Sequence, residues 1–152
     1  MIRATRAAAL AACTVMLAAT IGSAQQNEGK AVEFTTPENI KWTKNAAGTQ
    51  ETAVLFGALD KPGPYVARIR WLPGGMSRPH FHPNDRHFVV ISGTWWLGEG
   101  EKYDPESTVP VGPGTYVFHR AKGIHYDGAK KEPVVIQVWG MGPATSTPAE
   151  KK

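Results

Sequence analysis

The 152-residue chain has a single cysteine, Cys13, and it lies in an N-terminal apolar segment. Residues 1–6 carry two arginines, residues 7–21 are apolar and rich in alanine, and Gly22-Ser23-Ala24 offers small residues for cleavage. This is the pattern of a secretory signal peptide. The apolar run is shorter than the roughly 20 residues that span a bilayer. We therefore predict a signal peptide over residues 1–24 and a periplasmic or secreted protein, without stable membrane insertion after cleavage.

Cleavage after Ala24 leaves no cysteine, which excludes a disulfide framework and thiolate-ligated zinc. The whole chain has 17 Lys plus Arg and 13 Asp plus Glu. Losing Arg3 and Arg6 with the leader leaves 15 basic and 13 acidic residues, a net charge of only +2. The sequence also lacks a basic run with interleaved aromatics, so we expect no nucleic-acid partner.

Helical periodicity is absent after the leader, whereas short strand-like runs separated by Gly and Pro are frequent. The clearest run covers residues 65–72, where Tyr65, Ala67, Ile69 and Trp71 are predicted to share one face because side chains alternate along a strand. Further strands are predicted at 40–42, 52–56, 88–91, 94–97, 115–119 and 134–139. This pattern indicates an all-β sandwich or barrel over residues 37–142, with a flexible arm at 25–36 and a mobile tail at 143–152.

The most informative stretch runs from Gly74 to Gly93 and contains His80-Phe81-His82, then Arg86-His87. Side chains two residues apart on a strand point to the same face, so His80 and His82 can converge. Imidazole is the commonest protein metal ligand. The alternative is that both histidines are surface residues on an edge strand.

This stretch resembles the first motif of the cupin superfamily, in which a glycine, a His-x-His pair, a glutamate and a second glycine recur at fixed spacing. Gly74, His80, His82 and Gly93 match that spacing. The chain looks most similar to small, exported, single-domain cupins, most of them uncharacterised.

A second stretch resembles the second cupin motif, because Gly114 and His125 match its glycine and histidine in position and separation. Arg120 stands where proline is usual, and Gly123 lies one residue later than the usual glycine. The resemblance covers roughly residues 65–142. It implies a cupin-type antiparallel β-barrel, also described as a double-stranded β-helix or jelly roll.

The resemblance further implies a divalent transition metal (Fe, Mn, Zn or Ni) inside the barrel, with His80, His82 and His125 as ligands. The family's glutamate ligand is replaced by Arg86, which is always protonated and cannot ligate a metal. Three alternatives follow. A bulge could bring His87 into the glutamate's place, three histidines could leave open positions, or Arg86 could bind an anionic ligand instead.

The favoured function is metal-dependent chemistry on a small organic molecule, either dioxygenase-like or of the Lewis-acid type. His87 would complete the ligand set or carry a proton; no other catalytic residue is assigned. The rival is a non-catalytic periplasmic protein that binds a small ligand or a metal, with Arg86 holding an anion. A third alternative is a degenerate barrel acting only as an interaction module, and a homodimer through exposed strand edges is compatible with each.

Two residue types near the histidines stay unassigned in this interpretation. Asp85 and Asp127 could each orient an imidazole, but their Pro, Asn and Gly neighbours favour turn positions. His119 ends a predicted strand, and we assign it no ligand role.

Overall fold

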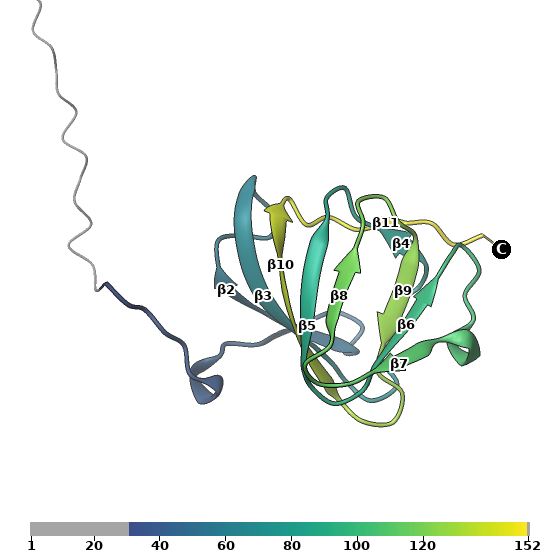
Figure 1. Ribbon diagram of the computed structural model, residues 1–152, viewed down its shortest axis with the longest axis horizontal. Coiled ribbons are helices and arrows are strands. Elements are labelled where there is room, and N and C mark those ends of the chain that lie inside the picture. The colour runs from purple at the N-terminus through teal and green to yellow at the C-terminus, as the bar shows by residue number, and fades with distance from the viewer. Residues whose placement is uncertain (1–30, 152) are drawn as a thin grey trace, which may run out of the picture. The chain divides into compact units, whose positions relative to one another are not determined.

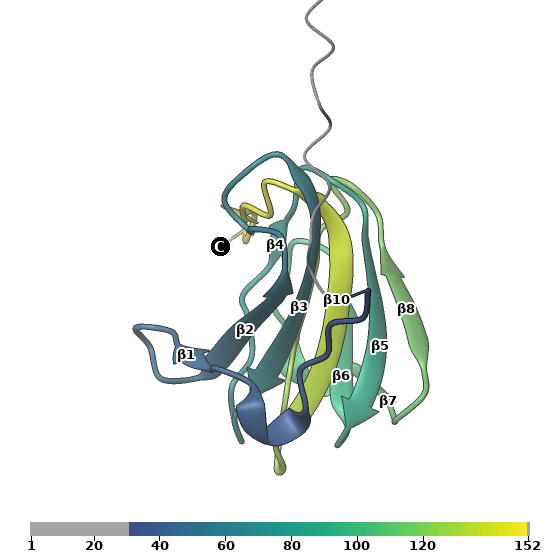
Figure 2. The ribbon, with the colours of Figure 1, turned by 90° about the vertical axis from the view of Figure 1, so that its left-hand side faces the viewer.

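A computed structural model of the chain describes residues 31–151, shown from two directions in Figures 1 and 2. Residues 34–152 form the second of two units of the chain, and the strands described here belong to it. The predicted signal peptide lies outside the described residues. Within residues 31–151, no helix is long and apolar enough to cross a membrane.

The second unit consists of two antiparallel sheets. The first has the strand order β1-β2-β3-β10-β5-β8 and the second has the order β11-β4-β9-β6-β7. The strands of the first sheet are β1 (Thr43–Lys44), β2 (Gln50–Phe56), β3 (Gly63–Trp71), β10 (Val134–Gly142), β5 (Arg86–Ser92) and β8 (Tyr116–His119). Those of the second are β11 (Thr147–Pro148), β4 (His80–Phe81), β9 (His125–Gly128), β6 (Trp95–Glu99) and β7 (Val109–Val111). Two short 3-10 helices, Pro37–Asn39 and Pro105–Ser107, complete the secondary structure of the described residues.

The predicted all-β fold is confirmed. Strand β3 follows the predicted alternation, with Tyr65, Ala67 and Trp71 buried and Ile69 partly buried. Its longest partner is β10, which pairs from Val134↔Trp71 to Gly142↔Gly63. Because apolar residues of β10 alternate in the same way, the two strands present one continuous apolar face.

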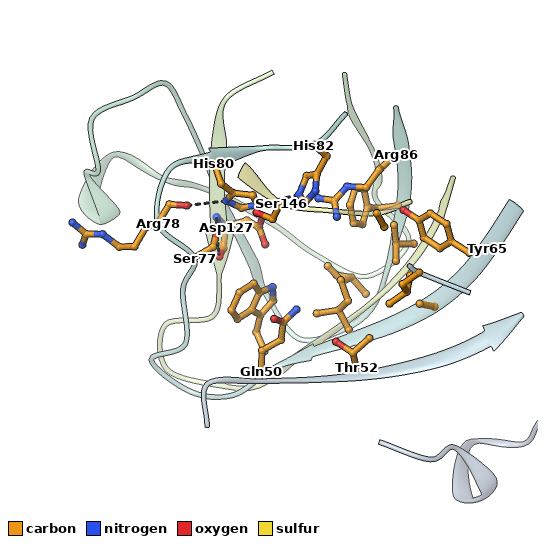
Figure 3. Close-up of a pocket in the computed structure, with 18 of the residues that line it drawn as sticks. Gln50, Thr52, Tyr65, Ser77, Arg78, His80, His82, Arg86, Asp127 and Ser146 are labelled. Atoms are coloured by element: carbon orange, nitrogen blue, oxygen red, sulfur yellow. Dashed lines mark hydrogen bonds between the residues drawn. The ribbon is translucent and has the colours of Figure 1, made fainter. Parts of the chain in front are cut away.

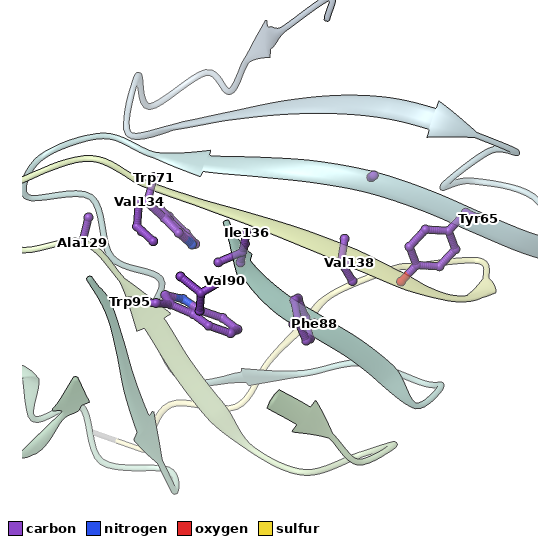
Figure 4. Close-up of a cluster of buried hydrophobic side chains, with 10 residues drawn as sticks. Tyr65, Trp71, Phe88, Val90, Trp95, Ala129, Val134, Ile136 and Val138 are labelled. Atoms are coloured by element: carbon purple, nitrogen blue, oxygen red, sulfur yellow. The ribbon is translucent and has the colours of Figure 1, made fainter. Parts of the chain in front are cut away.

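The core lies between the sheets, where this face meets Phe88 and Val90 of β5 and Trp95 of β6 (Figure 4). The ring centroids of Phe88 and Trp95 lie 5.1 Å apart. The turn that sends the chain from β5 to β6 requires Gly93, whose φ is +75° and whose missing Cβ would collide with the backbone carbonyl of Pro133. A residue with a side chain is disfavoured there on both counts.

The sequence did not predict β9, β7 or β11, whereas β4 was expected only from the spacing of His80 and His82. The expected edge strand at 40–42 lies slightly later, as β1. The segment from Pro143 onward is expected to be a mobile tail, whereas in the structure β11 pairs with β4, and Ala149 N–H donates to Pro79 O at 2.9 Å. Arg78 and Glu150 form a salt bridge. This segment therefore covers the edge of β4, which would otherwise expose unpaired backbone groups.

Candidate metal centre

Three histidines meet where β4 and β9 pair. His80 of β4 lies opposite His125 of β9 in the register, and His82 follows β4 by one residue. The Nε2 atoms of His80 and His82 are 3.1 Å apart. One ring nitrogen from each of the three histidines lies within 4.8 Å of the others, so this group could hold a metal ion.

Backbone carbonyls hold all three rings in one tautomer. His80 Nδ1 lies 2.8 Å from Arg78 O, His82 Nδ1 lies 2.8 Å from Thr145 O, and His125 Nδ1 lies 2.9 Å from Gly123 O. A carbonyl only accepts, so each Nδ1 carries the hydrogen and each Nε2 keeps its lone pair. The close Nε2 pair of His80 and His82 is therefore repulsive unless a cation or a proton lies between the two atoms. Anchoring of this kind is what metal-bound histidines generally show, and the donor set fits a divalent transition ion.

Burial keeps two of these imidazoles neutral. Desolvation, with the Arg86 charge as a smaller cause, lowers the pKa of His82 to about 3. Desolvation also lowers the pKa of His125, opposed chiefly by the negative charge of Asp127. Neutral imidazole is the form that binds metals, so the surroundings favour ligation over a wide pH range.

Strand β5 turns Arg86 inward and His87 outward. Arg86 is only 9% exposed, and its Nη2 lies 3.5 Å from His125 Nε2. His87 instead packs between Phe118 and Trp139, with Nδ1 2.8 Å from the hydroxyl of Tyr116. The irregularity in the pairing of β5 with β10 falls between Val90 and Ser92, at the far end of β5, so it does not exchange the two side chains. The structure thus does not bring His87 to the other three histidines.

Two residues that the sequence left aside lie against the cluster. His119, paired with Arg86 in the β5–β8 register, places its ring 4.0 Å from the ring of His125. Its Nδ1 is buried without a hydrogen-bond partner, and burial, followed by the charge of His125, lowers its pKa to about 2. Asp127 is not a turn residue but a buried member of β9, where it accepts a 3.0 Å hydrogen bond from Trp95 Nε1. His119, His125 and Asp127 form a second group whose spacing could hold an ion.

The alternation of side chains along a strand could have placed both residues, His119 and Asp127, on an inner face. His119 stands two residues after Val117 and so shares its inner face, and Asp127 stands two residues after His125. Recognising this required β8 and β9 to be identified as strands with a known register.

A cavity of about 390 Å³ opens beside the cluster (Figure 3). His80, His82 and Arg86 lie along one side of it, and Gln50 and Thr52 of β2 lie on the opposite wall. Most of the remaining lining residues are apolar, and more than half of these apolar residues come from β3 and β10. The size and the few convergent polar groups are those of a small-molecule site.

No protein-family model matches the chain. A germin-like protein of Mesembryanthemum crystallinum is 36% identical over 63 residues, which make up 41% of this chain and only 27% of that protein. Among solved structures, the polyketide cyclase RemF from Streptomyces resistomycificus aligns with a TM-score of 0.64 at 17% identity, over 80% of this chain and 87% of its own.

Two further structures have the same architecture. An RmlC-like cupin from Shewanella frigidimarina aligns with a TM-score of 0.57 at 13% identity, over 75% of this chain and 93% of its own. A protein from Klebsiella pneumoniae with a double-stranded beta-helix domain aligns with a TM-score of 0.58 at 21% identity, over 80% of this chain and 100% of its own. The chain therefore has the cupin fold, a double-stranded β-helix of two antiparallel sheets, as its histidine motifs predicted.

Proposed function

We propose that this chain is an exported metal-dependent cupin that binds one divalent transition metal through His80, His82 and His125. The observation that carries the proposal is the anchoring of all three rings through Nδ1, which leaves each Nε2 with its lone pair in a cluster whose ring nitrogens lie within 4.8 Å of one another. We further propose that a small organic molecule reacts in this cavity.

Three protein ligands leave positions for a substrate or water, as catalytic sites require. When bound, the ion would supply Lewis-acid or, for iron, oxygen chemistry. The chain's own residues orient the metal ligands and set the environment of the reacting molecule. The backbone carbonyls fix the imidazole rings, the apolar walls from β3 and β10 exclude water, and Arg86 places a positive charge beside the reacting molecule.

A second candidate function is supported by the inward position of Arg86. A guanidinium directed at His125 Nε2 at 3.5 Å competes with an ion for that lone pair, and like charges close together repel. A non-catalytic protein that binds an anionic small ligand through Arg86 would account for this arrangement. Measuring the metal content of the purified protein distinguishes the two functions.

The metal proposal is tested by elemental mass spectrometry on purified wild-type protein and His82→Ala. We expect close to one equivalent of a single transition metal in the wild type and less than a tenth of that in His82→Ala, because the variant removes one of three ligands. The matched control is His87→Ala, which removes an imidazole on the outer face and should keep full metal content.

A different pattern would support the binding-protein function. In that case the wild type would carry little metal while Arg86→Glu, which restores a carboxylate at this position, would load well. Equal loss of metal in His87→Ala and His82→Ala would contradict the assignment of the three ligands.

A further inference from the structure

Three buried polar atoms that line or face the cavity lack hydrogen-bond partners. They are Arg86 Nε, the Tyr65 hydroxyl and Trp71 Nε1. The Tyr65 hydroxyl and the Arg86 guanidinium lie close enough to interact with each other. Tyr65 is 1% exposed, Trp71 is 7% exposed and Arg86 is 9% exposed, so bulk water cannot readily satisfy them. A buried donor without a partner costs about as much as a lost hydrogen bond. All three atoms can donate a hydrogen, which indicates a ligand that carries acceptors.

The positive charge of Arg86 is also poorly compensated. Among residues 31–151, Arg86 forms no salt bridge, and its guanidinium carbon lies 5.0 Å from the ring centroid of Phe88. The nearest negative charge that acts on it is Asp127, whose carboxylate is already committed to Trp95 and lies 3.9 Å from His125 Nε2. The polar neighbours of Arg86, His125 Nε2 at 3.5 Å and the Tyr65 hydroxyl, are neutral, and a buried cation without an anionic partner is unfavourable. An anionic group from a ligand would supply what the chain lacks.

The rest of the cavity limits what this ligand can be. The walls beyond Arg86 are built largely from aliphatic and aromatic side chains such as Ile69, Ile136 and Val138. Arg78, the other arginine of the lining, is paired with Glu150. A single uncompensated cation among apolar walls suits one negative charge rather than the dianion of a phosphate ester.

We propose that the cavity binds a small, mostly apolar organic acid, with its carboxylate held between the Arg86 guanidinium and the Tyr65 hydroxyl. In Figure 3, Tyr65 lies beside Arg86 at one end of the cavity, and both side chains point inward. The carboxylate has enough lone pairs to accept from Arg86 Nε and from Tyr65 together. This inference rests on the proposed function for the reaction that follows, but the binding step needs no metal ion.

The test is isothermal titration of benzoate and 2-naphthoate, each against its neutral alcohol, benzyl alcohol and 2-naphthylmethanol. A carboxylate could also ligate a metal ion directly, so the titrations are run on protein stripped with a chelator and repeated after zinc loading. We expect the stripped wild type to bind at least one acid ten or more times more tightly than its alcohol. Tight binding of the acids only after zinc loading would overturn the inference.

Three variants assign the contacts. Arg86→Met, which keeps a side chain of similar length, should weaken acid binding at least tenfold and change alcohol binding by less than threefold. Tyr65→Phe, which removes only the hydroxyl, should weaken acid binding threefold or more. Tyr116→Phe is the control, because that hydroxyl bonds to His87 on the outer face.

Absence of binding by either acid up to 10 mM would overturn the inference, as would acid affinities that Arg86→Met and Tyr65→Phe leave unchanged. The same experiments distinguish failure of the metal proposal from failure of the carboxylate-binding inference. A protein that holds no metal but still prefers the acids through Arg86 would disprove the metal centre and support the carboxylate site.

Discussion

Replacing Trp95 by alanine is expected to lower the free energy of unfolding by about 3–5 kcal/mol, the usual cost of deleting a buried tryptophan. Trp95 is 0% exposed and packs against Phe88 and His119. The substitution also removes the hydrogen bond from Trp95 Nε1, the only one that the Asp127 carboxylate accepts within residues 31–151. An unsatisfied buried acceptor adds roughly 1–3 kcal/mol. Because domains are stable by about 5–15 kcal/mol, the variant should be marginally folded.

Urea denaturation followed by circular dichroism measures this change. Trp95→Phe separates the two causes, since it keeps an aromatic ring but loses the donor to Asp127. The control is Trp139→Ala, where the side chain is 36% exposed on the outer face and the cost should be well below half as large. Equal losses for the two alanine variants would show that Trp95 is not central to the core.

Acid should destabilise the metal-stripped protein steeply below pH 6.5. Burial lowers the pKa of His82 to about 3 and that of His119 to about 2, against 6.5 for an ordinary histidine. As the pH falls below 6.5, the unfolded chain therefore takes up at least two protons, at His82 and His119, that the folded chain does not. Each adds about 1.4 kcal/mol of destabilisation per pH unit, or roughly 2.7 kcal/mol for both, and the loss continues until the pH reaches the folded pKa values.

The measurement is the free energy of unfolding in urea at several pH values between 7.5 and 4.5, with a chelator present. His119→Phe should reduce the slope by about one proton, because it removes one of the buried imidazoles whose pKa is lowered. It also removes an Nδ1 atom that has no partner, so the variant should not be strongly destabilised at neutral pH. A flat profile between pH 6.5 and 5 would contradict the burial of neutral histidines.

Much of the fold was accessible from the sequence because its signals are local. Alternation along residues 65–72 identified the inner face of β3, and β-branched runs identified β5 and β10. Strand β9, which carries His125, was not identified, since it reads His-Tyr-Asp-Gly, a composition typical of turns. Pairing with β4 and β6, rather than intrinsic preference, makes that segment a strand.

The candidate site was likewise only partly predictable from the sequence. The spacing of His80, His82 and His125 was sufficient to propose that they meet. Whether Arg86 or His87 points toward them depended on which of the two side chains β5 turns inward, and the sequence did not determine this. A one-residue shift in phase would exchange the faces of the two side chains. The anchoring of His82 by Thr145 O joins residues 63 positions apart, and no local pattern encodes such a contact.

The C-terminal segment has a practical consequence for purification. Ala144, Ser146 and Pro148 line the cavity, Thr145 O orients His82, and Lys151 N–H donates to Glu101 O. A hexahistidine tag fused after this segment would bring six additional imidazoles close to the metal ligands and could strain the strand that covers them. Metal analysis would then report on the tag as well as on the protein. A cleavable tag, removed before any loading experiment, avoids both effects.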